Sequence, residues 1–171
     1  MKHQGSKILV LGGIKSGKSR FALALGEKFP PPRVFMATAE PFNEEMARKI
    51  EAHRRERGPG WQTVESPVDL PQKLKSLSSV GVCLIDCLTV WLGNLIYYQK
   101  DIDKYFQDFI KTLKEINFPM IMVSNEVGLS PISADSQTRF FVEKLGLLNQ
   151  EIARYCDQVY LLIAGKTLKL V

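Results

Sequence analysis

The chain has 171 residues, of which 45% are hydrophobic and 24% charged, and its net charge is +5. These values are typical of one soluble globular domain, 1–171, with a real core, and they exclude a low-complexity protein. No apolar run is long enough to span a bilayer. The positive charge suits polyphosphate substrates and would also suit nucleic acid. Because the basic residues are spread among acidic ones, we expect no nucleic-acid partner.

The N-terminus and the cysteines set the expected compartment. Residues 1–6 lack the layout of a signal peptide, so we expect a cytoplasmic protein. The chain has three cysteines, Cys83, Cys87 and Cys156, which are too few for a disulfide framework. Only His3 and His53 could complete a zinc site, so we expect Cys83 and Cys87 to be packed thiols rather than metal ligands.

Hydrophobic periodicity and breaker residues predict strands that alternate with helices along the chain. Strands are predicted at 7–11, 33–37, 61–65, 80–85, 119–124, 158–163 and 167–171. Helices are predicted at 20–29, 42–57, 68–77, 87–98, 101–116 and 134–155. This alternation is typical of βαβ crossovers. It predicts an α/β fold with a mostly parallel sheet, helices on both faces and a C-terminal hairpin.

A phosphate-binding loop is predicted between the first strand and the first helix, where the pattern G-x-x-x-x-G-K-S/T is matched at every fixed position. Its residues are Gly12, Gly13, Ile14, Lys15, Ser16, Gly17, Lys18 and Ser19. The glycines allow a sharp turn, so that backbone N–H groups and the helix dipole face a phosphate. We expect Lys18 to reach the β- and γ-phosphates and the Ser19 hydroxyl to bind Mg²⁺.

Asp86 follows the apolar run 80–85 in the manner of a Walker B strand. Ligands of open α/β sheets bind at the carboxyl ends of the strands. A carboxylate at that edge would hold Mg²⁺ or a water bound to it. The alternative is an ordinary aspartate that ends a strand or caps a helix.

His53 has two interpretations. It shares one face of the predicted helix 42–57 with Phe42, Met46 and Ile50, which favours a buried structural histidine. It is also followed by three arginines, Arg54, Arg55 and Arg57. Nearby positive charge favours a neutral imidazole, which can attack phosphorus while the cations stabilise the phosphate. For the arginines, a solvated helix end is the alternative.

At this point the residues resemble a known family, the bifunctional adenosylcobinamide kinase / adenosylcobinamide-phosphate guanylyltransferase of cobalamin biosynthesis. The resemblance runs almost from end to end and covers Ile8-Leu9-Val10 with the loop 12–20, then 37–39, Glu45-Met46, Ile50, His53, Trp61, 84–89, 124–128, Asn149-Gln150 and the terminal hairpin. The phosphate loop alone is not specific to the family. Its combination with His53 and Asn125-Glu126-Val127-Gly128 is specific.

The resemblance implies a RecA-like P-loop NTPase fold, a homotrimer and two activities. The first transfers the γ-phosphate of ATP or GTP to the aminopropanol hydroxyl of adenosylcobinamide. The second transfers GMP from GTP to adenosylcobinamide phosphate through a guanylylated His53, giving adenosylcobinamide-GDP and pyrophosphate. The positions implied in nucleotide binding are Ala37, Thr38, Ala39, Arg54, Arg55, Glu56, Arg57, Glu65 and Asp86.

Other functions also fit a phosphate loop. A monofunctional small-molecule kinase needs the loop and Asp86 but no nucleophilic His53. A regulatory GTPase usually reads guanine through N-K-x-D, where this chain has Asn125-Glu126-Val127-Gly128. A nucleic-acid-stimulated ATPase would respond to DNA or RNA in a salt-sensitive way. Glu126 ends a predicted strand at the active edge, which makes it a candidate base for the kinase step.

Overall fold

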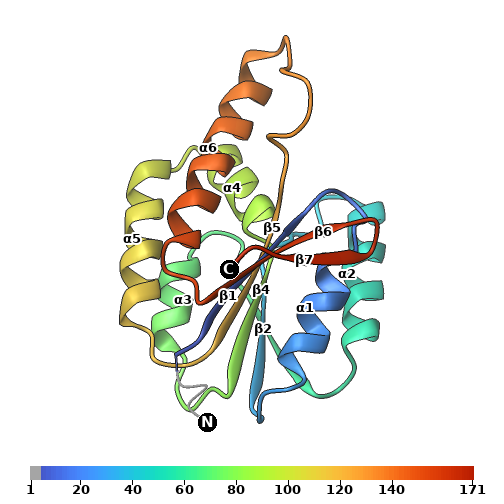
Figure 1. The fold of residues 1–171 in the computed structure, drawn as a ribbon, viewed down its shortest axis with the longest axis vertical. Helices are drawn as coiled ribbons and strands as arrows, with labels where there is room; N and C mark the ends of the chain where they lie inside the picture. Colours follow the sequence, from blue (N-terminus) through green and yellow to red (C-terminus); the bar gives the residue numbers. More distant parts are fainter. Residues whose placement is uncertain (1–4) are drawn as a thin grey trace.

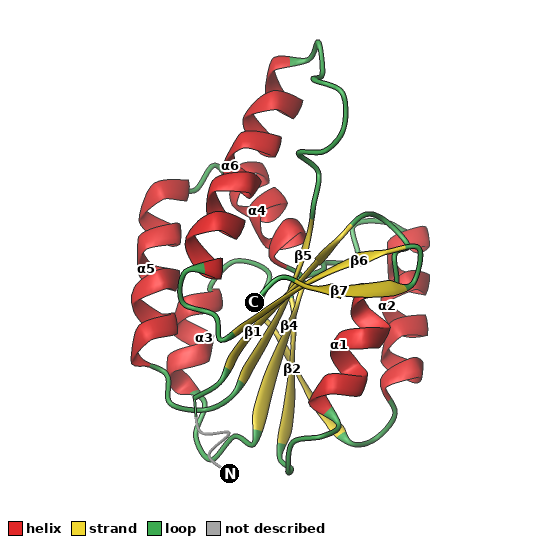
Figure 2. Ribbon diagram, viewed as in Figure 1, coloured by secondary structure: helices red, strands yellow, loops and turns green. Residues whose placement is uncertain are grey.

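The computed structural model of the chain describes residues 5–171 (Figure 1). Residues 1–4, including His3, lie outside the described part. Within 5–171, seven strands form one sheet in the order β3-β2-β4-β5-β1-β6-β7 (Figure 2). They are β1 Lys7–Gly12, β2 Arg33–Ala37, β3 Trp61–Glu65, β4 Val82–Asp86, β5 Met120–Asn125, β6 Gln158–Ile163 and β7 Lys166–Lys169. Neighbours in this sheet pair in parallel, except β6 and β7, which form an antiparallel hairpin. The predicted sheet is confirmed.

Helices cover both faces of the sheet (Figure 1). On one face lie α1 Lys18–Gly26 and α2 Glu44–Arg57, and on the other lie α3 Leu70–Ser76, α4 Leu88–Tyr97, α5 Ile102–Glu115 and α6 Ser136–Ala153. Each predicted helix is present, although α1 begins two residues earlier than predicted and α2, α3 and α6 begin two residues later. In the described residues, no helix is both long and apolar enough to cross a membrane.

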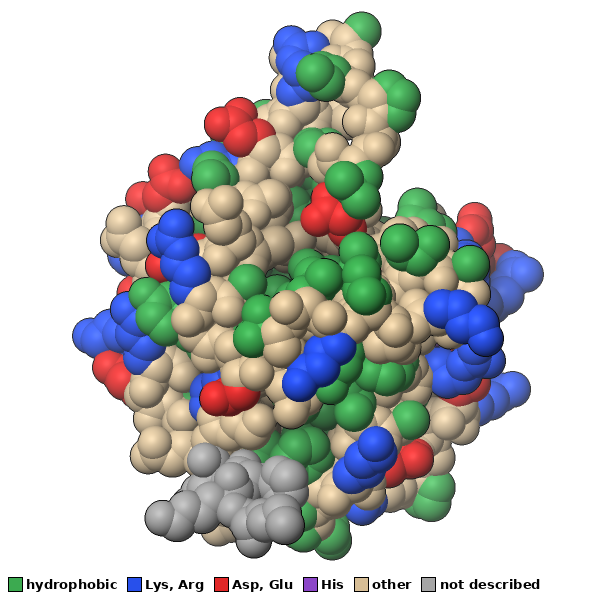
Figure 3. Space-filling view, viewed as in Figure 1, with side chains coloured by type: hydrophobic (Ala, Val, Ile, Leu, Met, Phe, Trp, Pro, Cys, Tyr) green, Lys and Arg blue, Asp and Glu red, His purple; other side chains and the backbone are tan. Residues whose placement is uncertain are grey.

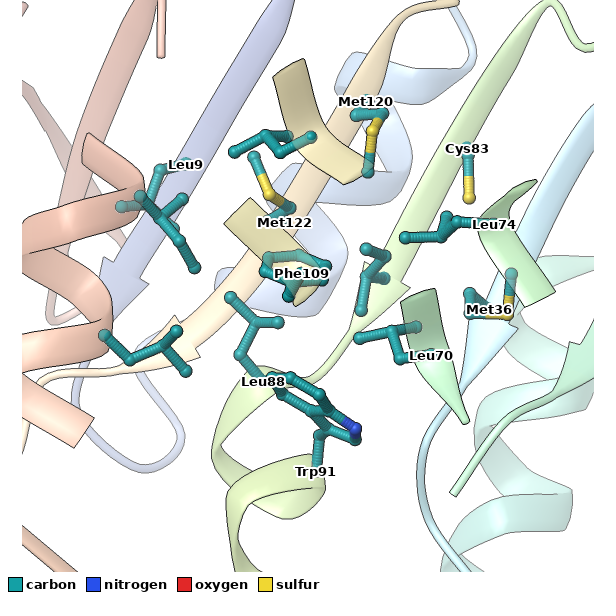
Figure 4. Close-up of a cluster of buried hydrophobic side chains, with 14 of the residues drawn as sticks. Leu9, Met36, Leu70, Leu74, Cys83, Leu88, Trp91, Phe109, Met120 and Met122 are labelled. Atoms are coloured by element: carbon teal, nitrogen blue, oxygen red, sulfur yellow. The ribbon is translucent and has the colours of Figure 1, made fainter. Parts of the chain in front are cut away.

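The two core layers follow from the alternation of side chains along the central strands. In β1, Leu9 packs in the layer under α3 to α6, whereas Val10 packs in the layer under α1. Figure 4 shows the first layer, where Trp91 and Phe109 lie between the helices and the strands. Their ring centroids are 5.3 Å apart. Because helices cover both faces, the central strands are apolar at nearly every position, which explains the continuous apolar runs in the sequence.

Helix α2 is the exception, because none of its residues is buried. The side chain of His53 is 55% exposed, so its interpretation as a buried structural histidine is wrong. The apolar positions Met46 and Ile50 are too few, among charged neighbours, to draw the helix into the core. Instead, Asn43 caps the helix by accepting a hydrogen bond from Met46 N at 2.8 Å. Local ion pairs such as Arg48 with Glu44 line its exposed sides.

Residues 126–140, here called the arm, project beyond the carboxyl edge of the sheet (Figure 1). The arm contains the loop after β5 and the first turns of α6. Leu129 and Ile132 are almost fully exposed there. Figure 3 shows hydrophobic side chains at the tip of this projection.

Candidate active site

A cleft of about 820 Å³ opens at the carboxyl edge of the sheet, between the loop after β1, helices α1 and α2, and the ends of β4 and β5. It is lined by Ile14, Lys15, Ser16, Gly17, Lys18, Ser19, Arg20, Leu23, Ala24, Glu27, His53, Glu56, Asp86, Cys87, Val123 and Asn125. This is the edge at which ligands of open parallel sheets bind. The structure thus brings together most of the predicted loop with His53, Glu56 and Asp86.

The phosphate loop has the backbone shape that the sequence predicted. Gly12 has φ 157°, and a Cβ there would lie 2.6 Å from Ser16 Oγ and from a β6 carbonyl oxygen. Gly17 has φ 96° and precedes the first residue of α1. The N–H of Glu126 donates to Gly12 O at 3.0 Å, and the N–H of Gly165 donates to Ser16 O at 3.1 Å. Strand β5 and the β6–β7 turn therefore hold the loop from two sides.

Lys18 lies buried in the first turn of α1, with its side chain over the loop. Its Nζ donates a hydrogen bond to Gly13 O at 2.6 Å. Burial lowers the pKa of Lys18, and the nearby Cys87 and Asp86 partly oppose this effect. The hydroxyl of Ser16 is buried without a hydrogen-bond partner among the described residues. Buried polar atoms normally have partners, so a bound phosphate oxygen would satisfy this one.

Asp86 and Ser19 form the second part of the cleft. Burial raises the pKa of Asp86, while a hydrogen bond from the Ser19 hydroxyl and the positive charges of Lys18 and Arg57 oppose the increase. Within 5–171, no group of three or more His, Cys, Asp or Glu residues could hold a metal ion. Mg²⁺ is commonly bound by one or two protein oxygens together with substrate phosphates and water. A hydroxyl beside a carboxylate fits that donor set.

His53 reaches the cleft from the exposed side of α2. Its Nδ1 lies 3.7 Å from Oε2 of Glu56, which also lines the cleft. Both side chains are largely exposed, so this pair contributes little to stability. His53 and Asp86 line the same cleft.

The three arginines after His53 have different surroundings, and the cleft lining of the described structure includes none of them. Arg57 is half-buried, with its guanidinium 3.7 Å from the centre of an aromatic ring of β2. Arg54 lies 3.7 Å from the carboxylate of Glu65, at the end of β3. Arg55 pairs with Glu51 on an exposed side of the helix.

The predicted segment 37–39 lies directly beside Asp86. Ala37 pairs with Asp86 in the sheet register. Thr38 is fully buried, and its hydroxyl donates to Cys87 O and accepts from Cys87 N, both at 2.8 Å. Asn94 Nδ2 donates to Thr38 O at 2.8 Å. The side chain of Thr38 therefore ties the end of β2 to the backbone that follows Asp86.

Some residues of the cleft were not among the predicted site residues. Arg20, Leu23, Ala24 and Glu27 form one face of α1, and their helical spacing after Ser19 could have identified them. Val123 and Cys87 come from strand ends. Burial and the charge of Asp86 raise the pKa of Cys87 to about 11, so its thiol stays neutral.

Asn125 also lines the cleft without having been predicted to do so. Its backbone N–H donates to Thr89 Oγ1 at 2.7 Å, and its carbonyl accepts from Asn149 Nδ2 at 3.0 Å. These contacts fix the end of β5 between the phosphate loop and Asp86. The neighbouring Glu126 lies outside the cleft lining, and its carboxylate accepts from the N–H of Gly128 at 2.6 Å.

Known proteins match the chain along nearly its whole length. The family model described as cobinamide kinase / cobinamide phosphate guanyltransferase matches residues 8–170. The bifunctional adenosylcobalamin biosynthesis protein CobP of Pseudomonas aeruginosa is 38% identical over 160 residues, which cover 92% of each chain. The protein of the same description named CobU in Escherichia coli is 31% identical over 180 residues, covering 95% of this chain and 98% of the relative.

Solved structures of low sequence identity share the fold. The flagellar accessory protein FlaH from Methanocaldococcus jannaschii matches with a TM-score of 0.53 at 11% identity, over 98% of this chain and 78% of FlaH. A prototypical ATPase from the type III secretion system of pathogenic bacteria matches with a TM-score of 0.56 at 11% identity. That match covers 94% of this chain but 51% of the ATPase, so this chain spans about half of it. With the phosphate loop, these likenesses confirm the predicted P-loop NTPase fold.

Proposed function

The chain belongs to the cobinamide kinase / cobinamide phosphate guanyltransferase family of cobalamin biosynthesis enzymes, and from this premise we propose how it performs the two reactions. It first phosphorylates adenosylcobinamide with ATP or GTP. It then transfers GMP from GTP through a guanylylated His53. The observation that carries the proposal is that one cleft is lined by Lys18, Asp86 and His53. The same nucleotide site would therefore serve both reactions.

In the kinase step, the acceptor hydroxyl attacks the γ-phosphorus directly, and the bond to the β-phosphate oxygen breaks. No protein nucleophile is required. The loop N–H groups and the Lys18 ammonium hold the triphosphate and stabilise the charge that develops on it. The hydroxyl proton passes to solvent.

In the guanylyl-transfer step, a nitrogen of His53 attacks the α-phosphorus of GTP, and pyrophosphate leaves. The position of Glu56 Oε2, 3.7 Å from Nδ1, supports a proton on Nδ1, which leaves the lone pair of Nε2 free for attack. The product is a phosphoramidate. A phosphate oxygen of adenosylcobinamide phosphate then attacks the same phosphorus, the P–N bond breaks, and His53 is regenerated.

The predicted nucleotide contacts outside the loop support this assignment by their positions. Residues 37–39 and Glu65 lie at or just beyond the carboxyl ends of β2 and β3, and Arg54, Arg55 and Arg57 lie on α2 with His53. The arginines would stabilise negative charge on the α-phosphate. Ser19 and Asp86 would hold Mg²⁺. When bound, Mg²⁺ neutralises phosphate charge and polarises the phosphoryl oxygens.

The proposal includes a homotrimer, which the resemblance implies. Leu129 and Ile132 of the arm are almost fully exposed, and a contact between subunits would bury them. Sedimentation would give the mass of the assembly. ATP and GTP are held in the cytoplasm, so we expect the reactions to take place there.

The test is to run both half-reactions on one preparation of the full chain. Adenosylcobinamide with γ-³²P-labelled ATP should give labelled adenosylcobinamide phosphate, and addition of GTP should then give adenosylcobinamide-GDP with pyrophosphate. Phosphorylation without nucleotidyl transfer would support the monofunctional kinase instead. A salt-sensitive increase of ATP hydrolysis on adding DNA or RNA would support the nucleic-acid-stimulated ATPase.

A further inference from the structure

Three exposed aromatic rings lie in contact at the carboxyl edge. Phe42, in the loop after β2, is 54% exposed, and Tyr97 and Tyr98, at the end of α4, are 67% and 41% exposed. The ring centroids of Phe42 and Tyr97 are 5.3 Å apart, and those of Tyr97 and Tyr98 are 5.0 Å apart. We call these residues the aromatic platform. Large aromatic side chains normally bury their faces, so three neighbouring exposed rings point to a binding surface.

The aromatic platform is connected to the cleft through the backbone. The β2 loop that carries Phe42 begins opposite Asp86, because Ala37 and Asp86 pair in register. Helix α4, which carries Tyr97 and Tyr98, begins directly after Asp86 and Cys87. The two hydrogen bonds between Thr38 and Cys87 tie these segments together. The loop after β2 and helix α4, which together carry the aromatic platform, therefore both begin beside the cleft.

The platform also lies near the start of α2, which begins at Glu44. His53 is nine residues further along this helix. At a rise of 1.5 Å per residue, that separation is about 14 Å along the axis. A bulky ligand on the platform could therefore extend a short side chain toward His53.

A carboxylate adjoins the rings. The hydroxyl of Tyr98 donates to Glu40, with distances of 3.0 and 3.2 Å to the two carboxylate oxygens. A carboxylate has about four lone-pair sites, so Glu40 retains acceptors for further N–H donors. Its negative charge also complements a cationic ligand.

From these observations we infer that the aromatic platform binds the corrin ring of the acceptor, with Glu40 accepting from the amide groups at the rim of the ring. The inference rests on the proposed function. The acceptor combines a wide, flat macrocycle around a positively charged cobalt centre with a flexible side chain that carries the reacting hydroxyl or phosphate. The Tyr97 ring stacks on the flat face, while Phe42 and Tyr98, tilted by 57° and 86° to it, contact the macrocycle with their edges. The carboxylate matches the charge and the amides, and the flexible side chain of the acceptor enters the nucleotide cleft.

The test compares Tyr97→Ala with the matched variant Tyr97→Phe, which keeps the ring and removes only its hydroxyl. The kinase half-reaction gives the KM for adenosylcobinamide and for ATP, and equilibrium dialysis gives the binding of adenosylcobinamide alone. Removal of one stacking ring should raise the KM for adenosylcobinamide about tenfold. The KM for ATP and the labelling of the protein by α-³²P-labelled GTP, which needs no acceptor, should not change. Phe42→Ala should act in the same direction as Tyr97→Ala.

Three results would overturn the inference while the wild-type protein still turns over. In the first, both alanine variants keep the wild-type KM for adenosylcobinamide. In the second, the KM for the nucleotide rises instead, and the platform binds the base. In the third, the KM values stay constant while sedimentation shows a changed oligomer, and the platform is a subunit contact. If the wild-type protein neither binds nor phosphorylates adenosylcobinamide, the proposed function itself fails.

Discussion

Replacement of Thr38 by valine should destabilise the backbone beside Asp86. Valine has nearly the shape of threonine, so the change removes only the hydrogen bonds of the hydroxyl. That hydroxyl pairs with both the N–H and the C=O of Cys87 at 2.8 Å. A buried backbone group left without a partner costs about 1–3 kcal/mol. The C=O of Cys87 keeps a second hydrogen bond, from Trp91 N at 3.2 Å, so only its N–H is left without a partner. Thr38→Val should therefore lower the free energy of unfolding by about 2 kcal/mol, from the orphaned N–H and the lost hydrogen bond to the C=O.

Thr38→Ser is the matched control, because it keeps the hydroxyl and loses one methyl group, a change worth about 1 kcal/mol. Urea unfolding of both variants gives the comparison. Thr38→Val should be less stable than Thr38→Ser by about 1 kcal/mol. It should also need more Mg²⁺ for phosphorylation, because Asp86 precedes Cys87 directly. A Thr38→Val protein as stable as Thr38→Ser would refute this reasoning and leave the hydroxyl free for the nucleotide.

Two further residues give predictions in the cleft. Lys18→Ala should reduce both activities by about 10²–10³-fold, since one preorganised charge contact contributes about 3–4 kcal/mol to the barrier; near-normal turnover of the folded variant would remove Lys18 from the nucleotide site. Because burial lowers the pKa of Lys18, its ammonium loses the proton before the pH reaches the ordinary pKa of lysine, and the rate of both reactions should fall there. A rate that stays constant up to the ordinary pKa of lysine would contradict this. Burial raises the pKa of Asp86 above its ordinary value of 3.8, so the folded state binds this proton more tightly than the unfolded state. The stability that the proton contributes is present below the unfolded pKa and is lost as pH rises through the folded pKa. Asp86→Asn should therefore be more stable than the wild type at neutral pH and should need more Mg²⁺, whereas an unchanged Mg²⁺ titration would make Asp86 only a strand-end residue.

The phosphate loop could be predicted from the sequence because its shape is set locally. The eight contiguous residues 12–19 contain the glycines that the turn requires, and a side chain at Gly12 would collide with the loop itself. The central strands were also predictable, because coverage on both faces makes them apolar at nearly every position. Asp86 was predictable for the same reason, as the first charged residue after such a run.

The rest of the site depends on how distant segments meet. Asn125 enters the cleft only because β5 lies between β1 and β4, an order that no local pattern specifies. The pattern of α2 indicates a helix but not whether another layer covers it, which is why His53 could be mistaken for a core residue. Similarly, the Thr38 hydroxyl has its partner at Cys87, which lies far from it in the sequence.

The most direct test of the account is the covalent labelling of His53→Asn by α-³²P-labelled GTP, measured beside its kinase activity. The wild-type protein should carry a label that is stable to base and lost in acid, as a phosphoramidate is. His53→Asn should lose this label and the formation of adenosylcobinamide-GDP, while it still phosphorylates adenosylcobinamide. Persistent acid-labile labelling of His53→Asn would place the nucleophile elsewhere. Equal loss of both activities in the folded variant would contradict a specific role of His53 in guanylyl transfer.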